Sequence, residues 1–448
     1  MLKTLMNDTG MSEKRRRGVL LSFQGWQRLQ SAEQLASVQQ NGGNPFTLEQ
    51  LSVSTGLSPN TLTKVRRRQK PVDFATLDTY FSTFELTLEP TDLITPEVHV
   101  QSAQNVSTQS QPPRGSLPLG SPYYVYRPPL ERLCFQEILN PGALIRIKAP
   151  RQFGKTSLTT QILGYAHDHS IKSSVVNLQL VEGEVLERPE TFLRWLCGSV
   201  AHELGLPSDL EKHWDGLFGA GYSCTDYFES YLLSSCDRPL LLVIDGFDEL
   251  FAYPEIAMDF CGLLRAWYEQ ARYGSKQEIW QKLRLVISHS MEVELPLNLH
   301  QSPFNVGVPV ELPGFDLHQT QEIASRYELD FAETDAQRLR QLVGGHPYLT
   351  QLGLFHLSQG LEMRQLLDSA IAYDGIFSSH LRRQLQLLEQ DAPLVQAMVE
   401  TAKSPQGVKL HPSQAYALKG LGLVQFKAQQ TVPSCDLYRQ YFATVLDF

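Results

Sequence analysis

The stretch Ala143–Ser157, with the sequence ALIRIKAPRQFGKTS, decides which fold the rest of the chain is expected to adopt. Its first half, Ala143–Lys148, is apolar enough to form a short buried strand. Its second half, Ala149–Ser157, fits the phosphate-loop pattern G-x-x-x-x-G-K-[ST], except that Ala149 stands at the first glycine. That position mainly requires a small side chain, so the alanine is a mild departure. A helix is expected to follow over Thr156–Ala166.

The residue types in this loop suit the phosphates of a nucleotide. Backbone N–H groups of such a loop and of the following helix surround phosphate groups, and Gly154 permits a close approach of the backbone. Lys155 would place its charge between the outer phosphates, and the Thr156 hydroxyl would be a ligand of Mg²⁺. We therefore expect a nucleotide and Mg²⁺ as cofactors, bound through Ala149, Pro150, Arg151, Gln152, Phe153, Gly154, Lys155, Thr156 and Ser157. That the nucleotide is ATP is implied by the family resemblance given below.

A second motif, Leu240–Leu250 with the sequence LLLVIDGFDEL, reads as a buried strand that ends in carboxylates. Asp245 at the strand end is placed to hold Mg²⁺ through its water shell. Asp248 and Glu249 would orient the attacking water. The alternative is that these acids only favour the start of a helix. Together with the phosphate loop, the motif predicts a catalytic set of Lys155, Asp245, Asp248 and Glu249.

From residue 123 onward, short apolar runs alternate with helical patterns, which predicts a parallel sheet with helices on both faces. Ligands of such sheets bind at the carboxyl ends of the strands. Further strands are expected at Ser174–Leu180, Leu240–Ile244, Leu283–Ser288 and Asn305–Leu312. Helices dominate after about residue 315, and Gly420–Phe448 reads as a helix, a small β-hairpin and a last helix.

These patterns divide the chain into five parts. Residues 96–122 are rich in Ser, Gln, Pro and Gly and nearly uncharged, which predicts a flexible linker. The expected order is a helix-turn-helix-like domain at 14–95, the linker at 96–122, a P-loop ATPase core at 123–313, a helical domain at 314–372 and a winged-helix-like domain at 373–448.

The N-terminal part contains two helices separated by a glycine turn at Gly56. Ser58 is a natural N-cap, and Pro59 suits the first position of the second helix. The apolar spacing predicts a core built from Leu48, Leu51, Leu57, Leu62 and Val65, with another helix contributing Phe74, Leu77, Phe81 and Leu86.

This pattern resembles a helix-turn-helix of the phage-repressor type. It also resembles the N-terminal domain of cyanobacterial AAA-like proteins and of von Willebrand A/MoxR-associated proteins. If it binds DNA, the helix Pro59–Arg68 would enter the major groove. Asn60, Thr61 and Lys64 would then face bases or phosphates, with Arg66, Arg67 and Arg68 near the backbone. Docking of a protein through residues 14–95 is the equal alternative.

Charge and composition limit the other partners. The net charge is −9, but residues 1–90 hold 11 Lys+Arg against 8 Asp+Glu, so a nucleic-acid contact would be confined to that part. The run Lys14–Arg17 is either solvated or a contact to the DNA backbone. None of the 6 cysteines forms a C-x-x-C pair, which favours buried thiols in a cytoplasmic protein. No apolar run approaches the roughly 20 residues that span a membrane.

The two motifs, Ala149–Ser157 and Asp245–Glu249, and the strand end at Val286–Ser290 carry a family resemblance. The form hhhhD-G-h-D-E resembles the STAND class of P-loop ATPases (signal-transducing ATPases with numerous domains). More narrowly, the chain is similar to the cyanobacterial "AAA-like domain" family. The resemblance implies that Arg127 packs on the base and phosphates, that Ser288 and His289 sense the γ-phosphate, and that Pro347 packs on the adenine.

Plainer interpretations stay open for these positions. His289 would equally suit a satisfied core histidine, and Gly345 and Pro347 would suit a helix end and the start of the next helix. The resemblance also implies a winged helix at Ala415–Phe448 and a nucleotide-dependent homo-oligomer.

Two functions follow from the resemblance as hypotheses. The first is a regulatory switch that binds and slowly hydrolyses ATP and relays a signal through the N-terminal domain, in transcriptional regulation or defence. The second is a DNA-transaction ATPase of the AAA+ type, similar to regulators of transposition and stimulated by DNA. It would require an arginine supplied by a neighbouring molecule, for which Arg272 and Arg284 are the candidates.

Overall fold

The computed structural model of the chain describes residues 19–21, 23–41, 46–67, 72–89, 92–94, 112–113, 115–214, 217–290 and 302–446. The chain divides into two compact units, Met1–Gln109 and Ser110–Phe448. Lys14–Arg17 and Arg68 lie outside the described residues, and so do residues 96–111 and 114 of the predicted linker.

The N-terminal unit consists of short helices around one apolar core. Its elements are β1 (Leu20–Leu21), α1 (Phe23–Gln40), α2 (Leu48–Thr55), α3 (Pro59–Arg67), α4 (Phe74–Thr83) and β2 (Leu93–Ile94). Gly56 ends α2 in the left-handed conformation, with φ of 69°. The Ser58 hydroxyl accepts a hydrogen bond from the backbone N–H of Thr61 at 3.1 Å. The turn therefore has the glycine and the N-cap serine that the sequence predicts.

The core of this unit contains most of the predicted apolar residues, but two of them are exposed. Leu51, Leu62, Val65, Leu77 and Phe81 are buried. The prediction is wrong for Leu48 and Phe74, whose exposed fractions are 39% and 53%. Each is the first residue of its helix and lies at the edge of the core. A unit of this size has a small core, which few side chains fill.

The larger unit is built on a five-stranded parallel sheet with strand order β4-β5-β6-β3-β7. The strands are β3 (Leu144–Lys148), β4 (Lys172–Asn177), β5 (Leu240–Asp245), β6 (Leu283–His289) and β7 (Val308–Glu311). In the register, Ile145 of β3 pairs with Val286 of β6 on one side and Val308 of β7 on the other. The central strands β5 and β6 are almost entirely buried, as expected for a sheet covered on both faces.

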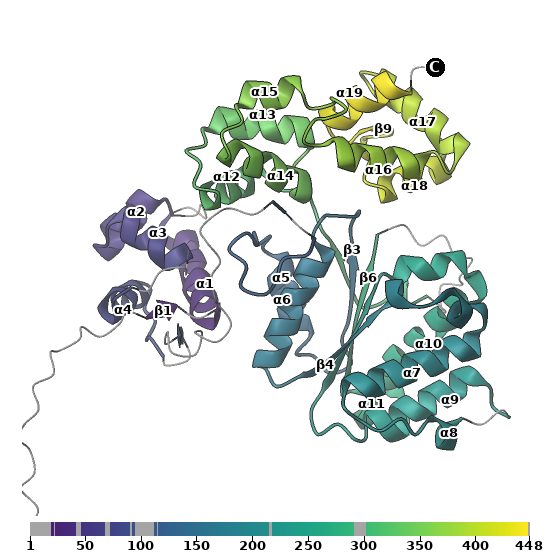
Figure 1. Ribbon diagram of the computed structural model, residues 1–448. Coiled ribbons are helices and arrows are strands. Elements are labelled where there is room, and N and C mark those ends of the chain that lie inside the picture. The colour runs from purple at the N-terminus through teal and green to yellow at the C-terminus, as the bar shows by residue number, and fades with distance from the viewer. Residues whose placement is uncertain are drawn as a thin grey trace, which may run out of the picture. The chain divides into compact units, whose positions relative to one another are not determined.

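Helices cover both faces of this sheet (Figure 1). Helices α5 (Leu130–Glu137) and α6 (Lys155–Asp168) lie on one face, and α7 (Pro189–Glu203), α9 (Ala220–Asp226) and α10 (Pro254–Tyr273) lie on the other. Shorter elements complete this part: α8 (Leu210–His213), α11 (Gln277–Trp280), the 3₁₀ helices η3 (Leu178–Leu180), η4 (Gly183–Glu187), η6 (Phe247–Ala252) and η7 (Pro303–Asn305), and the π-helix η5 (Tyr227–Leu232). The arrangement is that of a P-loop nucleotide-binding core.

Two predicted strands are shorter than expected. The strand expected at Asn305–Leu312 is limited to β7 at Val308–Glu311, because the 3₁₀ helix η7 extends to Asn305 and Gly307 has φ of 68°. Instead of running over Ser174–Leu180, β4 ends at Asn177 and the chain continues as the 3₁₀ helix η3. The Asn177 side chain accepts a hydrogen bond from the backbone N–H of Gln179 at 3.0 Å. An asparagine that caps its own following turn stops the strand at that point.

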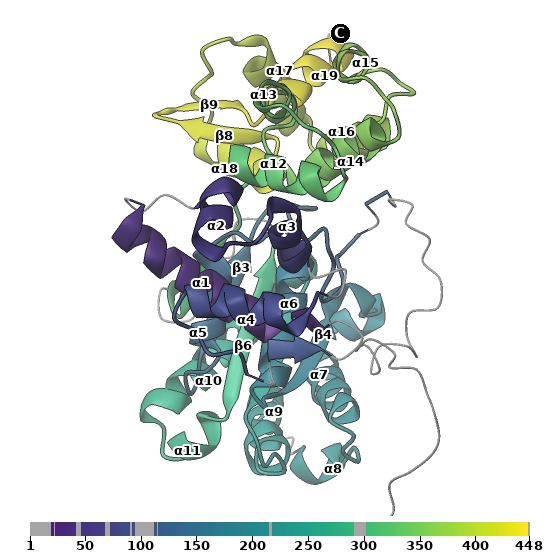
Figure 2. The same ribbon diagram turned by 90° about the vertical axis from the view of Figure 1, so that its left-hand side faces the viewer.

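The rest of this unit is helical apart from one β-hairpin. The helices are α12 (Leu317–Arg326), α13 (Glu333–Val343), α14 (Pro347–Ser358), α15 (Met363–Asp368), α16 (Ser378–Leu388), α17 (Ala392–Lys403), α18 (Pro412–Gly420) and α19 (Asp436–Val445). The hairpin β8 (Val424–Lys427) and β9 (Gln430–Pro433) lies beside α18 (Figure 2). Leu339 and Leu352 share one apolar core with Leu437 and Phe442, so the residues 314–372 and 373–448 are packed together.

Gly345 gives a test of this packing. It has φ of +73°, and a Cβ atom added there would lie 2.2 Å from the backbone oxygen of Phe315. We expect Gly345→Ala to lower the free energy of unfolding by about 1–3 kcal/mol, because both the backbone conformation and the contact oppose a side chain. Urea denaturation measures the change. The matched control is Gly262→Ala in α10, where nothing lies within 4 Å and alanine favours the helix. Equal midpoints for the two variants would contradict this account.

Candidate functional site

The loop between β3 and α6 changes direction through two residues with positive φ. Gln152 has φ of 65° and Gly154 has φ of 94°. A Cβ atom at residue 154 would lie 3.2 Å from Nη2 of Arg127, so glycine also leaves room for that guanidinium. Helix α6 then begins at Lys155, and its first N–H groups have no acceptor within the helix. This is the geometry of a loop that binds an anion through its backbone.

A cavity of about 240 Å³ opens beside this loop. Its walls come from segments that are far apart in the sequence: loop residues 152–157, Arg127, Phe315, Pro347 and residues 115–117. Arg127 and Pro347 therefore line the same cavity as the phosphate loop, whereas Ala149, Pro150 and Arg151 are not part of the lining. Residues 115–117 belong to the predicted linker, and the backbone N–H of Leu117 donates to the Ser157 hydroxyl at 2.9 Å.

The Lys155 ammonium group is held by acceptors of the protein itself. Its Nζ atom donates to the backbone oxygen of Ala149 at 2.7 Å, to that of Pro150 at 3.2 Å and to the Ser290 hydroxyl at 2.8 Å. Burial lowers the pKa of Lys155 to about 8, against the opposing effect of Asp248 and Asp245. Ser290 was not singled out from the sequence, although it directly follows the sensor pair predicted at the end of β6.

The carboxylates after β5 have different surroundings. Oδ2 of Asp245 lies 3.4 Å from the Thr156 hydroxyl, which brings the two predicted Mg²⁺ ligands together. Both side-chain oxygens of Asp248 accept the backbone N–H of Ser290, each at 2.8 Å. Asp248 thus holds the backbone at the end of β6 in place through hydrogen bonds. Glu249 is half-buried in the 3₁₀ helix η6.

These residues fit a magnesium nucleotide. A hydroxyl and a carboxylate 3.4 Å apart are the hard oxygen donors that Mg²⁺ prefers. The loop backbone and the lysine supply the anion-binding groups. Thr156 and Asp245 are therefore the residues that would hold the ion, whose charge would neutralise the phosphate oxygens when it is bound.

Ser288 and His289, the predicted γ-phosphate sensors, do not line the cavity. Both are buried, with exposed fractions of 0% and 5%. The His289 ring packs edge-on against Phe304 at 5.0 Å between centroids. In the described part of the chain, the Ser288 hydroxyl has no hydrogen-bond partner.

Arg127 is positioned by a buried network that the sequence did not reveal. Its backbone N–H donates to both oxygens of Glu131, at 3.0 and 2.9 Å, and the Tyr124 hydroxyl donates to the same carboxylate at 2.9 Å. Its Nη1 atom donates to the backbone oxygen of Phe153 at 2.9 Å. The guanidinium also lies 5.9 Å from the Phe315 ring centroid. Arg127 thus joins the segment before α5 to the phosphate loop.

The C-terminal segment also contacts the loop. The His380 Nδ1 atom lies 2.8 Å from Oε1 of Gln152, and its Nε2 atom lies 2.7 Å from the Tyr438 hydroxyl. The Phe153 ring packs edge-on against His346 at 4.6 Å. Burial lowers the pKa of His380 to about 4 and that of His346 well below its usual value, so both are neutral at neutral pH.

A glycine completes this contact. A Cβ atom at Gly422, which follows α18, would lie 2.8 Å from Cβ of Pro150. Sequence reasoning had no signal for His380 and Gly422, because both are separated from the loop by more than 200 residues.

The two arginines proposed to act on a neighbouring molecule are used within the chain. Arg284 is buried and donates to the backbone oxygens of Ile138, Gln281 and Lys282 at 2.8–3.1 Å. Arg272 lies over the Tyr268 ring at 3.4 Å and donates to Gly142 at 3.3 Å. Arg284 is therefore not free to reach another subunit, and the expectation is wrong for it. Arg272 is exposed and donates only from its Nη1 atom among the described residues, so for Arg272 the expectation stays a prediction.

The lowered pKa of Lys155 predicts how phosphate binding depends on pH. Above about pH 8 the free protein loses the ammonium charge, whereas a bound phosphate would raise the pKa of Lys155 again. Binding of a nucleoside triphosphate should therefore take up a proton and weaken by up to about tenfold per pH unit above pH 8. Calorimetry in buffers of different ionisation enthalpy measures both effects. Lys155→Arg is the control, since its guanidinium stays charged and its affinity should not follow this slope.

Comparison with known proteins agrees with this geometry. Residues 112–444 match the family described as AAA-like domain. A WD repeat-containing protein of Synechocystis sp., itself described as uncharacterized, is 24% identical over 250 residues, which are 53% of this chain and 20% of that protein. The chain thus spans about a fifth of this relative's length.

Solved structures with a similar arrangement have low sequence identity. The Walker-type ATPase of Pyrococcus abyssi is 14% identical, with 73% of this chain and 98% of that chain covered and a TM-score of 0.49. The ORC2 protein of Aeropyrum pernix is 14% identical over 71% and 92%, with a TM-score of 0.41. A STAND protein of Pyrococcus horikoshii with a tetratricopeptide repeat sensor is 14% identical over 72% and 42%, with a TM-score of 0.32. No helix in the described ranges is long and apolar enough to cross a membrane. From the family match over most of its length, the chain belongs to the AAA-like domain family of P-loop ATPases.

Proposed function

We propose that the protein is a regulatory switch that binds ATP and hydrolyses it slowly. In this proposal the state of the nucleotide determines whether the C-terminal segment stays packed on the phosphate loop. The N-terminal unit then relays the signal, in transcriptional regulation or defence. The observation that carries the proposal is the contact of three loop residues, Pro150, Gln152 and Phe153, with Gly422, His380 and His346.

Through these contacts, a change in the conformation of the loop would directly change the packing of the C-terminal segment. Gln152 has a positive φ, and its side chain is hydrogen-bonded to His380. His380 is also hydrogen-bonded to Tyr438 of α19. A loop that rearranges around phosphates would break or remake this chain of hydrogen bonds. A switch requires such a difference between two states and does not require fast turnover.

The site residues have separate roles in this proposal. Lys155 would exchange its contacts with Ala149 and Ser290 for the outer phosphates, and Thr156 and Asp245 would hold Mg²⁺. Glu249 orients the attacking water and accepts its proton. Asp248 acts indirectly by holding Ser290, so its loss would disturb the lysine rather than the water.

The N-terminal unit supplies a surface for the output. On α3, Asn60 and Lys64 are exposed. Arg66 instead turns inward, because it pairs with Glu33 at 2.5 Å and donates to the Tyr80 hydroxyl at 3.2 Å. Among the side chains of α3 that the structure describes, Asn60 and Lys64 therefore remain for a DNA or protein partner, and Arg66 serves the fold.

The central test is ATP turnover with and without duplex DNA. Wild-type protein should hydrolyse ATP slowly and with no response to DNA, since the loop is held by the chain's own C-terminal segment. Lys155→Ala should abolish turnover, and Glu249→Gln should lower it by about 10²–10⁴-fold with nucleotide binding retained. Many-fold stimulation by DNA would favour the DNA-transaction ATPase instead. Absence of nucleotide binding by the wild-type protein would refute both functions.

The contact between His380 and the loop has its own test. His380→Ala removes hydrogen bonds to Gln152 and Tyr438, each contributing about 0.5–1.5 kcal/mol. We expect a fluorescent ADP analogue to leave this variant about 3- to 30-fold faster than the wild type. His411→Ala is the matched control, because His411 is exposed in the same segment and its ring contacts the hydroxyl of Ser413, two residues away. An unchanged or slower release from His380→Ala would argue against the switch.

A further inference from the structure

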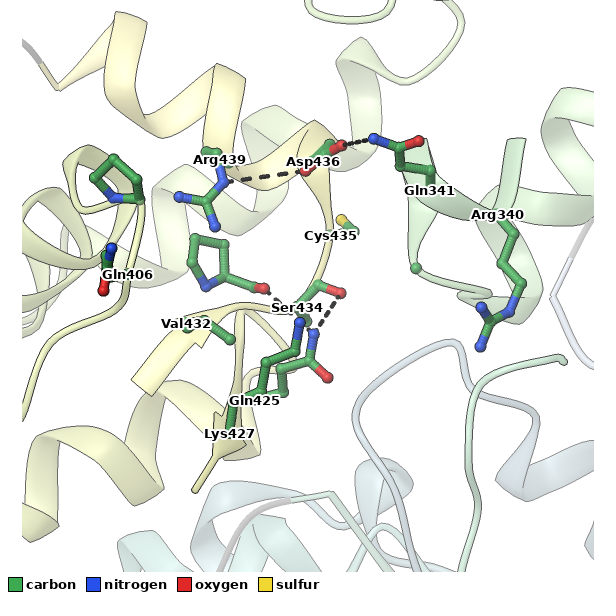
Figure 3. A pocket seen from close by; sticks show the side chains of 13 residues that line it. Arg340, Gln341, Gln406, Gln425, Lys427, Val432, Ser434, Cys435, Asp436 and Arg439 are labelled. Carbon is green, nitrogen blue, oxygen red and sulfur yellow. Dashed lines mark hydrogen bonds and ion pairs between the residues drawn. The ribbon is translucent and has the colours of Figure 1, made fainter. Parts of the chain in front are cut away.

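A second, larger cavity lies in the C-terminal half, away from the phosphate loop. It has a volume of about 510 Å³ and is enclosed by the end of α13, the β8–β9 hairpin and the start of α19 (Figure 3). Each of these elements contributes one cation to the wall: Arg340, Lys427 and Arg439. We propose that this cavity binds a small phosphate-bearing anion.

The charge of the cavity is not balanced by its own residues. Among the residues that the structure describes, no carboxylate lies within 4.0 Å of Arg340 or Lys427. Arg340 donates from Nε to the backbone oxygen of Phe315 at 3.2 Å, which leaves both of its terminal nitrogens for a ligand. The single carboxylate of the wall, Asp436, is engaged by Gln341 at 3.0 Å and lies 4.0 Å from Nε of Arg439.

The remaining lining groups favour the same class of ligand. Figure 3 shows the side chains of Lys427 and Gln425 next to each other on the hairpin, with Arg439 and Arg340 on other sides of the cavity. Guanidinium, ammonium and amide groups all donate hydrogen bonds, and a terminal guanidinium fork matches phosphate oxygens. A concave site of this volume is in the range of small-molecule sites, roughly 300–1,000 Å³. It therefore fits a compact anion better than a flat macromolecular surface.

The anion cavity is connected to the nucleotide cavity through residues 344–347. Gly344 lines the former and Pro347 the latter. Between them, the backbone oxygen of Gly345 accepts the N–H of Phe315 at 2.7 Å. Phe315 lines the nucleotide cavity, and its own oxygen is the acceptor of Arg340. A ligand that moves Arg340 thus acts on a residue of the nucleotide cavity, and by linkage the two sites influence each other.

The test is calorimetric titration with inorganic phosphate and, separately, with ribose 5-phosphate. All proteins carry Lys155→Ala, so that the phosphate loop does not contribute. Against this background, Arg340→Gln and Lys427→Gln should each weaken binding by about tenfold or more, because each removes a charged hydrogen-bond donor. Lys409→Gln, which removes an exposed cation of the same segment outside the cavity, should change the affinity less than twofold. Tighter binding of ribose 5-phosphate than of phosphate would identify a phosphorylated metabolite as the ligand class, and the reverse would identify free phosphate.

Two results would overturn the proposal. One is that phosphate does not bind at all. The same holds if phosphate binds the cavity variants as tightly as the Lys409→Gln control. The other is duplex DNA binding that Lys427→Gln abolishes in the absence of any binding of the small anions, which would assign these cations to a nucleic-acid surface. Lys427 is exposed on the hairpin, so this variant keeps the test valid even if Arg340→Gln unfolds. In protein with intact Lys155, ribose 5-phosphate should alter the release rate of ADP by several-fold, and Lys427→Gln should reduce that effect.

Discussion

The structure of the nucleotide site depends on the buried ammonium group of Lys155, which requires hydrogen-bond acceptors within the protein. Lys155 is largely withdrawn from water, and its pKa is lowered to about 8 as a result. Two loop carbonyls and the Ser290 hydroxyl supply the acceptors, and Asp248 in turn holds the backbone of Ser290. The loop after β3, the turn after β5 and the end of β6 are therefore tied together at one edge of the sheet. The parallel register makes this possible, because it brings the carboxyl ends of adjacent strands to the same place.

The same loop is the point where the other parts of this unit meet. Arg127 reaches it from the segment before α5, Leu117 contacts Ser157 from residues further upstream, and His380 contacts Gln152 from α16. Each contact is a single hydrogen bond of modest net energy. They are coupled because they share one short loop, so a ligand that reshapes the loop changes them together.

The parts of this structure that the sequence predicted are those encoded locally. The strand-loop-helix around Gly154, the acidic end of β5 and the capped turn at Ser58 all depend on neighbours within a few residues. Exposure was harder to predict for Leu48 and Phe74, because apolar spacing does not tell where a small core ends. The roles of Ser290, His380 and Gly422 could not be predicted, since each depends on a contact that only the folded chain brings together.

Arg284 is a residue for which the sequence suggested a functional role that the fold does not allow. In the sequence it was a candidate because a DNA-transaction ATPase would require an arginine supplied by a neighbouring molecule. In the fold its guanidinium is buried and satisfied by backbone oxygens, which makes it part of the support for β6 and the segment after α5. Arg340 contrasts with it, because within the described chain only its Nε atom has a hydrogen-bond acceptor, and its side chain lines a cavity. What separates an arginine of the scaffold from one that can bind a ligand is thus the number of donors left unsatisfied after folding, and composition and spacing do not encode that number.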